Sequence, residues 1–234
     1  MQPSVIVAID SLLTGRVQPI GTAGKFSGIA KQATLEPLTV TLLGIEGDEQ
    51  ADTRHHGGRD KAIHHYAAEH YRAWREEFPL ADTHKFAPGG FGENISTVGL
   101  TEETVCLGDR FRLGDAEVQV SQPRQPCWKL NVHLGHSRIA HRVQSSGRTG
   151  WYYRVLRTGT VSAGDTMELL ERPLPQWPLS RIIALLYHDM LNTTLLAEFV
   201  ELETLPQGWR ELALGRLRSG QVEDWESRLS GLTE

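Results

Sequence analysis

Residues 110–121 read RFRLGDAEVQVS, and this stretch decides the fold class. Apolar and polar side chains alternate from residue 116 onward, and alternation with a period of two is typical of a β-strand. Gly114-Asp115 separates this run from residues 110–113, and both residue types favour turns. A second Gly-Asp pair occurs at residues 108–109. The stretch therefore predicts short strands joined by tight turns.

Further short strand patterns occur on both sides of this stretch. They are residues 5–9, 38–43, 105–107, 152–156 and 166–170. Several short strands separated by turns favour a β-barrel or a sandwich over a βαβ sheet. We therefore expect a mainly β, α+β fold.

Two helices are predicted inside this β-rich body. The longer one covers residues 60–78, with Asp60 as its N-cap and Pro79 as its stop signal. Its apolar face is formed by side chains three or four residues apart, namely Ile63, Ala67, Tyr71, Trp74 and Phe78. The shorter helix covers residues 136–145.

The character of the chain changes after residues 172–178, which read RPLPQWP. Three prolines so close together favour a linker, and the sequence beyond them has the apolar periodicity of three short amphipathic helices. We predict a body of residues 1–172 and a C-terminal helical bundle of residues 173–234. A unit of about 55 residues buries little surface alone, so we expect the bundle to dock on the body.

The composition excludes several classes of protein. The chain has 234 residues and a formal charge of -5, which argues against a partner that is a nucleic acid polymer. No apolar run approaches the roughly 18 to 20 residues that span a bilayer, so no membrane partner is expected. Two cysteines give no disulfide framework, and we therefore expect a cytoplasmic protein.

One of the two cysteines lies in an unusual setting. Residues 121–131 read SQPRQPCWKLN, so Cys127 follows Pro123 and Pro126 and is flanked by Arg124 and Lys129. The prolines predict a rigid turn, and nearby cations favour the ionised, metal-binding or nucleophilic form of a thiol. The alternative is that Cys127 is a buried structural cysteine. For Cys106, which lies in an apolar strand pattern, we predict that structural role.

Two glycine-rich stretches could bind a ligand. Residues 55–61 read HHGGRDK before the predicted helix, where backbone N–H groups, Arg59 and Lys61 would favour a phosphate; a solvated loop is the alternative. Residues 89–95 read GGFGENI and predict a tight turn that ends in polar side chains. Neither stretch matches a dinucleotide fingerprint or a P-loop.

Zinc and serine chemistry find no support in the spacing of the residues. Residues 65–70 read HYAAEH, which is one residue too long for the H-x-x-E-H zinc pattern. A zinc site assembled from distant loops stays open, but surface or packing roles are the more frequent ones for His64, His65 and His70. The chain contains no G-x-S-x-G sequence.

Four blocks in order resemble the MOSC domain family and, within it, the YiiM-like group. They are GDEQAD at 47–52, HGGRDKA at 56–62, FGENI at 91–95 and QPRQPCWKL at 122–130. The helical tail is similar to the three-helix extension of that group. The resemblance implies a MOSC-type β-barrel with inserted helices, and it covers nearly the whole chain.

The resemblance also implies a molybdenum cofactor, a molybdopterin, with Cys127 as the molybdenum ligand and catalytic residue. Related proteins reduce small N-hydroxylated compounds such as hydroxylaminopurine base analogues, a detoxification. The two electrons would come from a separate reductase, a flavoprotein or an iron–sulfur protein. A soft thiolate suits such a metal, and a cationic surround suits a phosphorylated pterin.

The remaining site residues follow from the same resemblance. Arg124 and Lys129 would bracket the cofactor, and Asn94 would donate a hydrogen bond to it. His56, Gly58 and Lys61 would line the phosphate or substrate side. Ser27 and Lys31, in residues 25–31 (KFSGIAK), would contact the pterin or the phosphate.

Other functions remain open at this point. A cofactor-binding or sulfur-carrier module would use a Cys127 persulfide, and the sequence alone does not separate this role from the reductase. A small-molecule binding protein with an inert thiol is a third possibility. The helical tail could dock the electron donor, form a homodimer or only pack on the body.

Overall fold

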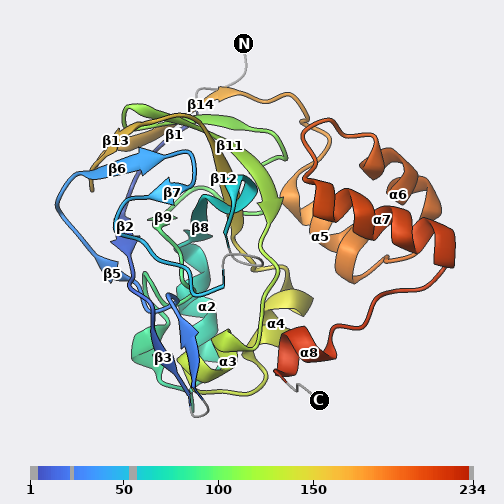
Figure 1. Cartoon of the computed structure of the whole chain (residues 1–234), viewed down its shortest axis with the longest axis horizontal. Helices are drawn as coiled ribbons and strands as arrows, with labels where there is room; N and C mark the ends of the chain where they lie inside the picture. Colours follow the sequence, from blue (N-terminus) through green and yellow to red (C-terminus); the bar gives the residue numbers. More distant parts are fainter. Residues whose placement is uncertain (1–4, 22–23, 53–56, 232–234) are drawn as a thin grey trace.

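The chain builds one large, strongly curved sheet with helices at its ends (Figure 1). The computed structural model describes residues 5–21, 24–52 and 57–231. The strands of the large sheet are, in spatial order, β1 (Ile6–Ala8), β14 (Thr166–Glu171), β10 (Arg110–Leu113), β11 (Ala116–Pro123), β12 (Trp151–Arg157), β8 (Ile63–Ala67), β9 (Ile95–Thr97), β2 (Ser11–Thr14) and β5 (Gln32–Ala33). Neighbours pair antiparallel except β8 and β9, which are parallel.

Two smaller sheets complete the β structure of the described residues. One pairs β13 (Gly159–Val161), β6 (Leu38–Thr41) and β7 (Gly44–Ile45). The other is the hairpin of β3 (Gln18–Ile20) and β4 (Lys25–Ser27). The predicted strands at residues 110–113 and 116–121 are confirmed as β10 and β11, and residues 105–107 contribute only an isolated bridge from Cys106 to Pro178.

The sheet bends back on itself where the chain passes from β1 to β2. Only Ile9 and Asp10 separate these strands, although β1 pairs with β14 and β2 pairs with β9. The backbone N–H of Ile9 donates to Asp165, and that of Asp10 donates to Ser96, at 2.8 and 3.0 Å. Hydrogen-bond partners therefore change within two residues. Among the described residues no ladder joins the two edge strands, β1 and β5, so a sheet-rich α+β body is confirmed and the closed barrel is not.

Three helices of the body, α2 (Glu69–Glu77), α3 (Lys129–Leu134) and α4 (Ile139–Ser146), lie below the sheet in Figure 1. The body also has two short 3-10 helices, η1 (Arg59–Lys61) and η2 (Thr83–Lys85). The predicted helix at residues 136–145 corresponds to α4, whereas α3, which begins two residues after Cys127, was not predicted.

The helix predicted for residues 60–78 is wrong in its first half. Residues 63–67 form β8, all five of them buried, and they pair with β12 on one side and β9 on the other. A strand buried on both faces shows no period of two, and its apolar positions can fit a helical spacing by chance. The real helix, α2, begins at Glu69 and ends at Glu77, close to the predicted stop.

The C-terminal region contains the three predicted helices and one more. These are α5 (Leu179–Tyr187), α6 (Thr193–Val200), α7 (Gln207–Ser219) and the short α8 (Glu226–Ser230). Figure 1 shows α5, α6 and α7 together beside the sheet, and α8 apart from them, next to α4. Because α5 to α7 share one apolar core with the sheet, the bundle docks on the body as expected.

The linker between body and bundle is held against the sheet. Arg172 forms an ion pair with the buried Asp109 at 2.7 Å, and Trp177 is buried. The division of the chain at residue 172 stays a prediction. Within the described part of the chain, no helix has the length and apolarity needed to cross a membrane.

Candidate functional site

Cys127 lies in a pocket that we call the cysteine pocket. Cys127 belongs to the loop between β11 and α3 and is only 8% exposed. The residues that line the pocket come from six stretches of the chain: Ser27, Gly28, Ile29, Lys31, Asp48, Glu49, Gln50, Ala51, Asp52, Lys61, His64, Phe91, Gly92, Asn94, Arg124, Cys127, Lys129 and Tyr152. A break in the strand at this point is confirmed, because β11 ends at Pro123 and α3 begins at Lys129, and Cys127 lies in the loop between them. The rigidity of this turn stays a prediction.

Close backbone approach shapes one wall of the pocket. A Cβ atom added to Gly28 would lie 2.0 Å from the carbonyl oxygen of Glu49. No side chain fits in that space, so a glycine at this position lets residues 27–31 pack directly on residues 48–52. This contact brings Lys31 beside Asp48.

Four cationic side chains line the cysteine pocket: Lys31, Lys61, Arg124 and Lys129. Lys31 forms an ion pair with Asp48, and both side chains are almost fully buried. Burial lowers the pKa of Lys31, and the charge of Asp48 opposes this shift. Asp48 also accepts a hydrogen bond from the backbone N–H of Gly15 at 2.8 Å, which fixes the pair in place.

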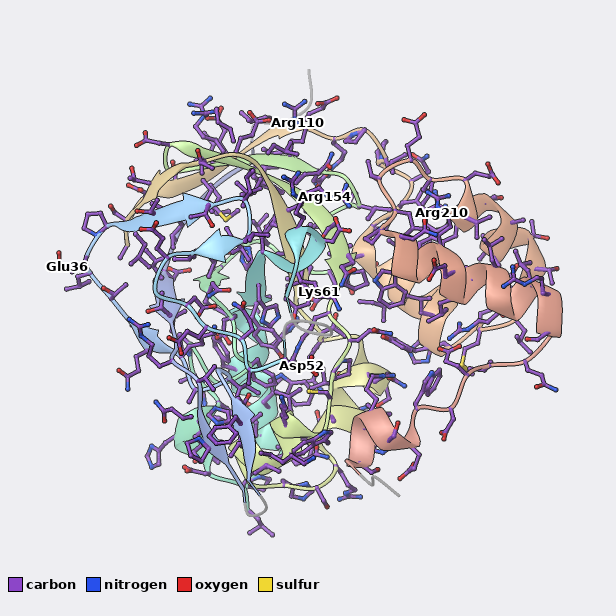
Figure 2. The ribbon with its side chains drawn as sticks, viewed as in Figure 1. Glu36, Asp52, Lys61, Arg110, Arg154 and Arg210 are labelled. Carbon is purple, nitrogen blue, oxygen red and sulfur yellow. The ribbon has the colours of Figure 1, made fainter. Side chains whose placement is uncertain are left out.

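Lys61 reaches the pocket from η1. Burial lowers its pKa, while the charges of Asp60 and Asp52 oppose the change. Figure 2 shows Asp52 and Lys61 near the middle of the molecule, between the sheet and the lower helices. This part of the pocket therefore combines a lysine of lowered pKa with carboxylates.

Arg124 and His64 each place a buried polar atom without a protein partner in this pocket. The Nη1 atom of Arg124 and the Nε2 atom of His64 are buried and have no hydrogen-bond partner in the structure. The backbone of Arg124 is held, since its N–H donates to Gly150 at 2.9 Å. A buried guanidinium N–H without an acceptor costs on the order of 1–3 kcal/mol or more, so this site is built to receive an acceptor.

His64 is uncharged at neutral pH in this environment. Burial lowers its pKa well below the usual value, and the nearby charge of Arg124 adds to the effect. Its ring lies 5.0 Å from that of Tyr152, centroid to centroid. The pocket thus presents a neutral imidazole beside a fixed guanidinium.

Asn94 is oriented by the backbone on both sides. Its Oδ1 accepts from the N–H of His64 at 3.1 Å, and its Nδ2 donates to the carbonyl oxygen of Leu13 at 3.2 Å. The amide nitrogen carries a second N–H that can point to a ligand. Asn94 therefore ties β8 to β2 and lines the cysteine pocket at the same time.

The structure brings most of the predicted site residues together. Seven of them line the cysteine pocket: Ser27, Lys31, Lys61, Asn94, Arg124, Cys127 and Lys129. Gly58 does not; it is exposed, has a φ of 93° and precedes η1 as its N-cap. His56 lies outside the described residues.

The pocket also contains residues that the sequence did not indicate as site residues, and His64, Asp48 and Tyr152 are three of them. His64 was expected at the surface or in packing because residues 60–78 looked helical. Asp48 lies in the quoted block at 47–52, but nothing in the sequence pairs it with Lys31. Tyr152 was assigned only to a strand, and the pattern of apolar and polar residues along that strand does not indicate which of its faces lines the pocket.

The donor set of the cysteine pocket fits an anionic ligand that also carries a soft atom or metal. Cationic side chains and an unpartnered guanidinium favour a phosphate, and a thiol is a ligand for soft metals. Zinc patterns and nucleotide loops do not explain this combination.

Comparison with protein families agrees with this combination of fold and site. The MOSC domain model matches residues 52–168, and the model of the YiiM-like, 3-alpha helix domain matches residues 177–220. The chain belongs to the MOSC domain family. It carries the YiiM-like helical domain after it.

Individual relatives are similar over nearly the whole chain. Protein YiiM of Escherichia coli (strain K12) is 42% identical over 218 residues, covering 93% of this chain and 96% of that protein. The crystal structure of YiiM from Escherichia coli superposes with a TM-score of 0.79 at 36% identity, covering 96% of this chain and 98% of the other.

A longer relative carries a functional name. A protein of Gibberella moniliformis (strain M3125 / FGSC 7600) named "Reductase" is 36% identical over 220 residues, which cover 93% of this chain but 38% of that protein. The family and this relative link the chain to redox chemistry at a coarse level.

Proposed function

We propose that this chain is a molybdenum-dependent reductase of N-hydroxylated compounds, such as hydroxylaminopurine base analogues. The observation that carries the proposal is the cysteine pocket, where the Cys127 thiol faces the same space as four cationic side chains and an unpartnered guanidinium N–H. Membership of the MOSC domain family and the relative named "Reductase" support it.

In this proposal Cys127 would bind the molybdenum through its Sγ atom, Lys31, Arg124 and Lys129 would hold the phosphate of the pterin, and Lys61 would lie on the substrate side. Arg124 donates from Nη1, and the second N–H of Asn94 Nδ2 donates to the pterin or to a metal-bound ligand. When bound, the cofactor would supply the two-electron redox chemistry of the reduction.

The overall reaction consumes two electrons and two protons. The N–O bond of R–NHOH breaks, an N–H bond forms, and the products are R–NH₂ and water. A separate flavoprotein or iron–sulfur reductase supplies the electrons, because no flavin or iron–sulfur motif occurs in the chain.

We assign proton delivery to Nζ of Lys61. Its pKa is lowered by burial, so it releases a proton more readily than an exposed lysine. Lys61→Met should slow turnover on the order of tenfold or more and leave the molybdenum content unchanged. Full turnover in this variant would refute the assignment.

The decisive experiment is purification from cells that synthesise molybdopterin, followed by measurement of molybdenum and pterin. Wild-type protein should contain both, and Cys127→Ala should contain little molybdenum. A wild-type protein without either would contradict the proposal.

The loaded wild-type protein should then reduce hydroxylaminopurine with an artificial electron donor. Undiminished reduction by Cys127→Ala would contradict the ligand role. A persulfide on Cys127 that is transferred to an acceptor, with no reduction of the substrate, would identify a sulfur carrier instead.

A further inference from the structure

One residue of the C-terminal helix α8 bonds to the peptide groups on both sides of Cys127. The Nη1 atom of Arg228 donates to the carbonyl oxygen of Pro126 at 2.6 Å. The carbonyl oxygen of Arg228 accepts from the backbone N–H of Trp128 at 2.8 Å. The first bond holds the peptide unit before Cys127, and the second holds the peptide unit after it.

The guanidinium of Arg228 is itself fixed by the body. Its Nη2 atom donates to Oε1 of Gln144, a buried side chain of α4, at 2.6 Å. The Arg228 side chain is therefore a bridge between α4 and the cysteine loop. Arg228 does not line the cysteine pocket.

Neighbouring residues of α8 anchor it to the same loop and to α3. The Nδ2 atom of Asn131 donates to the carbonyl oxygen of Leu229 at 2.9 Å, and Leu229 is buried. A Cβ atom added to Gly231 would lie 2.7 Å from the Trp128 ring. The chain thus turns tightly over the residue that follows Cys127.

We propose that Arg228 is a positioning residue which, through its guanidinium and its own carbonyl oxygen, fixes both peptide units that meet at Cys127 and so directs the thiol into the pocket. This inference rests on the proposed function, in which Cys127 is the metal ligand. Residues 226–230 follow the segment matched to the YiiM-like helical domain, which ends at residue 220.

The physical reason is the freedom of the loop. Residues 124–127 form no regular structure, and the two prolines restrict only their own φ angles and those of the residues before them. A single thiolate holds a metal well only when its direction is preset, because a loose ligand loses conformational entropy on binding. The Arg228 bonds supply this restriction from a distant part of the chain.

The test uses hydrogen exchange on full-length, cofactor-free protein together with molybdenum content of protein from molybdopterin-producing cells. In Arg228→Met, the peptide that covers residues 124–131 should exchange at least about fivefold faster, since bonds that restrain its backbone are weakened. Arg228→Lys keeps a donor and should restore most of the protection. Molybdenum content should fall at least about threefold in Arg228→Met.

Arg218→Met is the matched control, because it removes the same charge from an exposed position of α7. It should leave exchange at residues 124–131 and the molybdenum content unchanged. Urea unfolding of each variant separates a local change from a global loss of stability. If Arg228→Met does not fold, the Gln144→Leu variant tests the positioning role instead, because it removes the hydrogen-bond acceptor of the Arg228 guanidinium without altering α8. Hydrogen exchange at residues 124–131 should then rise about twofold.

The positioning role would be overturned if hydrogen exchange at residues 124–131 is unchanged in a folded Arg228→Met variant. If Arg228→Met does not fold, the same result in Gln144→Leu would overturn it. A wild-type protein without molybdenum would instead refute the proposed function, and the exchange result would still stand. The two failures are therefore distinguishable.

Discussion

The two cysteines of the chain are both buried, but their surroundings differ in charge and in access. Cys106 is 4% exposed and lies at the junction between the sheet and the helical bundle, where its Sγ–H donates to the carbonyl oxygen of Pro175 at 3.8 Å. Cys127 is 8% exposed and lines a pocket with four cationic side chains. The degree of burial is thus nearly the same at the two positions.

Burial, more than the nearby charges, keeps the Cys106 thiol protonated. Burial raises the pKa of Cys106 to about 11, and the carboxylate of Asp109 adds to the shift. Asp109 also binds the backbone N–H of Cys106 at 2.9 Å, so the carboxylate cannot move away. The comparison teaches that the fold uses one thiol as a small apolar group and offers the other to a ligand.

The largest difference between the two cysteines should appear in catalysis. Cys127→Ser should reduce hydroxylaminopurine reduction on the order of a thousandfold, because the hydroxyl is a poor ligand for a soft metal. Cys106→Ser should change it less than about twofold, since Cys106 lies outside the cysteine pocket. Steady-state rates, normalised to folded protein, measure both; equal losses in the two variants would remove the distinction.

A smaller difference should follow from the guanidinium that faces Cys127. Arg124→Met removes a charge-assisted hydrogen bond, which is worth about 2 kcal/mol, so cofactor affinity should fall about thirtyfold. Arg172→Met, which removes the guanidinium near Cys106, should leave cofactor affinity unchanged. Molybdenum and pterin retained after extensive dialysis measure the effect, and equal retention in Arg124→Met and wild type would contradict it.

The part of the site that the sequence predicts is the part whose residues are near one another in the chain. Cys127, Arg124 and Lys129 fall within six residues, with prolines that fix the local backbone, so their setting is visible without a structure. Lys61 was also indicated by the glycine-rich stretch at residues 55–61, whereas the roles of Ser27, Lys31 and Asn94 came from the family resemblance. The structure brings all four to the same pocket.

The rest depends on contacts between distant residues. His64 was hidden because a strand buried on both faces, β8, has no alternating pattern, and its apolar positions fitted a helix. The bond from Arg228 to Pro126 spans 102 residues, and neither residue type predicts the other. The curvature of the sheet likewise depends on a change of partner at Ile9 and Asp10, which local propensity does not encode.

The two thiols should also differ in their reaction with an alkylating agent. With a pKa of about 11, about one in ten thousand Cys106 thiols is ionised at pH 7, and only the thiolate reacts. We expect iodoacetamide to modify Cys127 of the cofactor-free protein at least about tenfold faster than Cys106. Mass spectrometry of the two cysteine-containing peptides measures the rates, and comparable rates at pH 7 would show that both thiols share one environment.

The smallest expected effect is the dependence of stability on pH at Cys106. The folded-state pKa is raised from 9.0 to about 11, so the folded protein keeps a proton that the unfolded chain releases between these values. The free energy of unfolding should therefore fall as the pH rises from about 9 to 11, by up to about 2 kcal/mol from this group. Cys106→Ala should lose that part of the pH dependence. Urea unfolding of the wild-type protein and of Cys106→Ala at pH 8.5 and pH 10.5 tests this. The tyrosines titrate alike in the two proteins, so the difference between their changes in unfolding free energy reports Cys106. An equal decrease in both proteins would mean that Cys106 is not held in its neutral form.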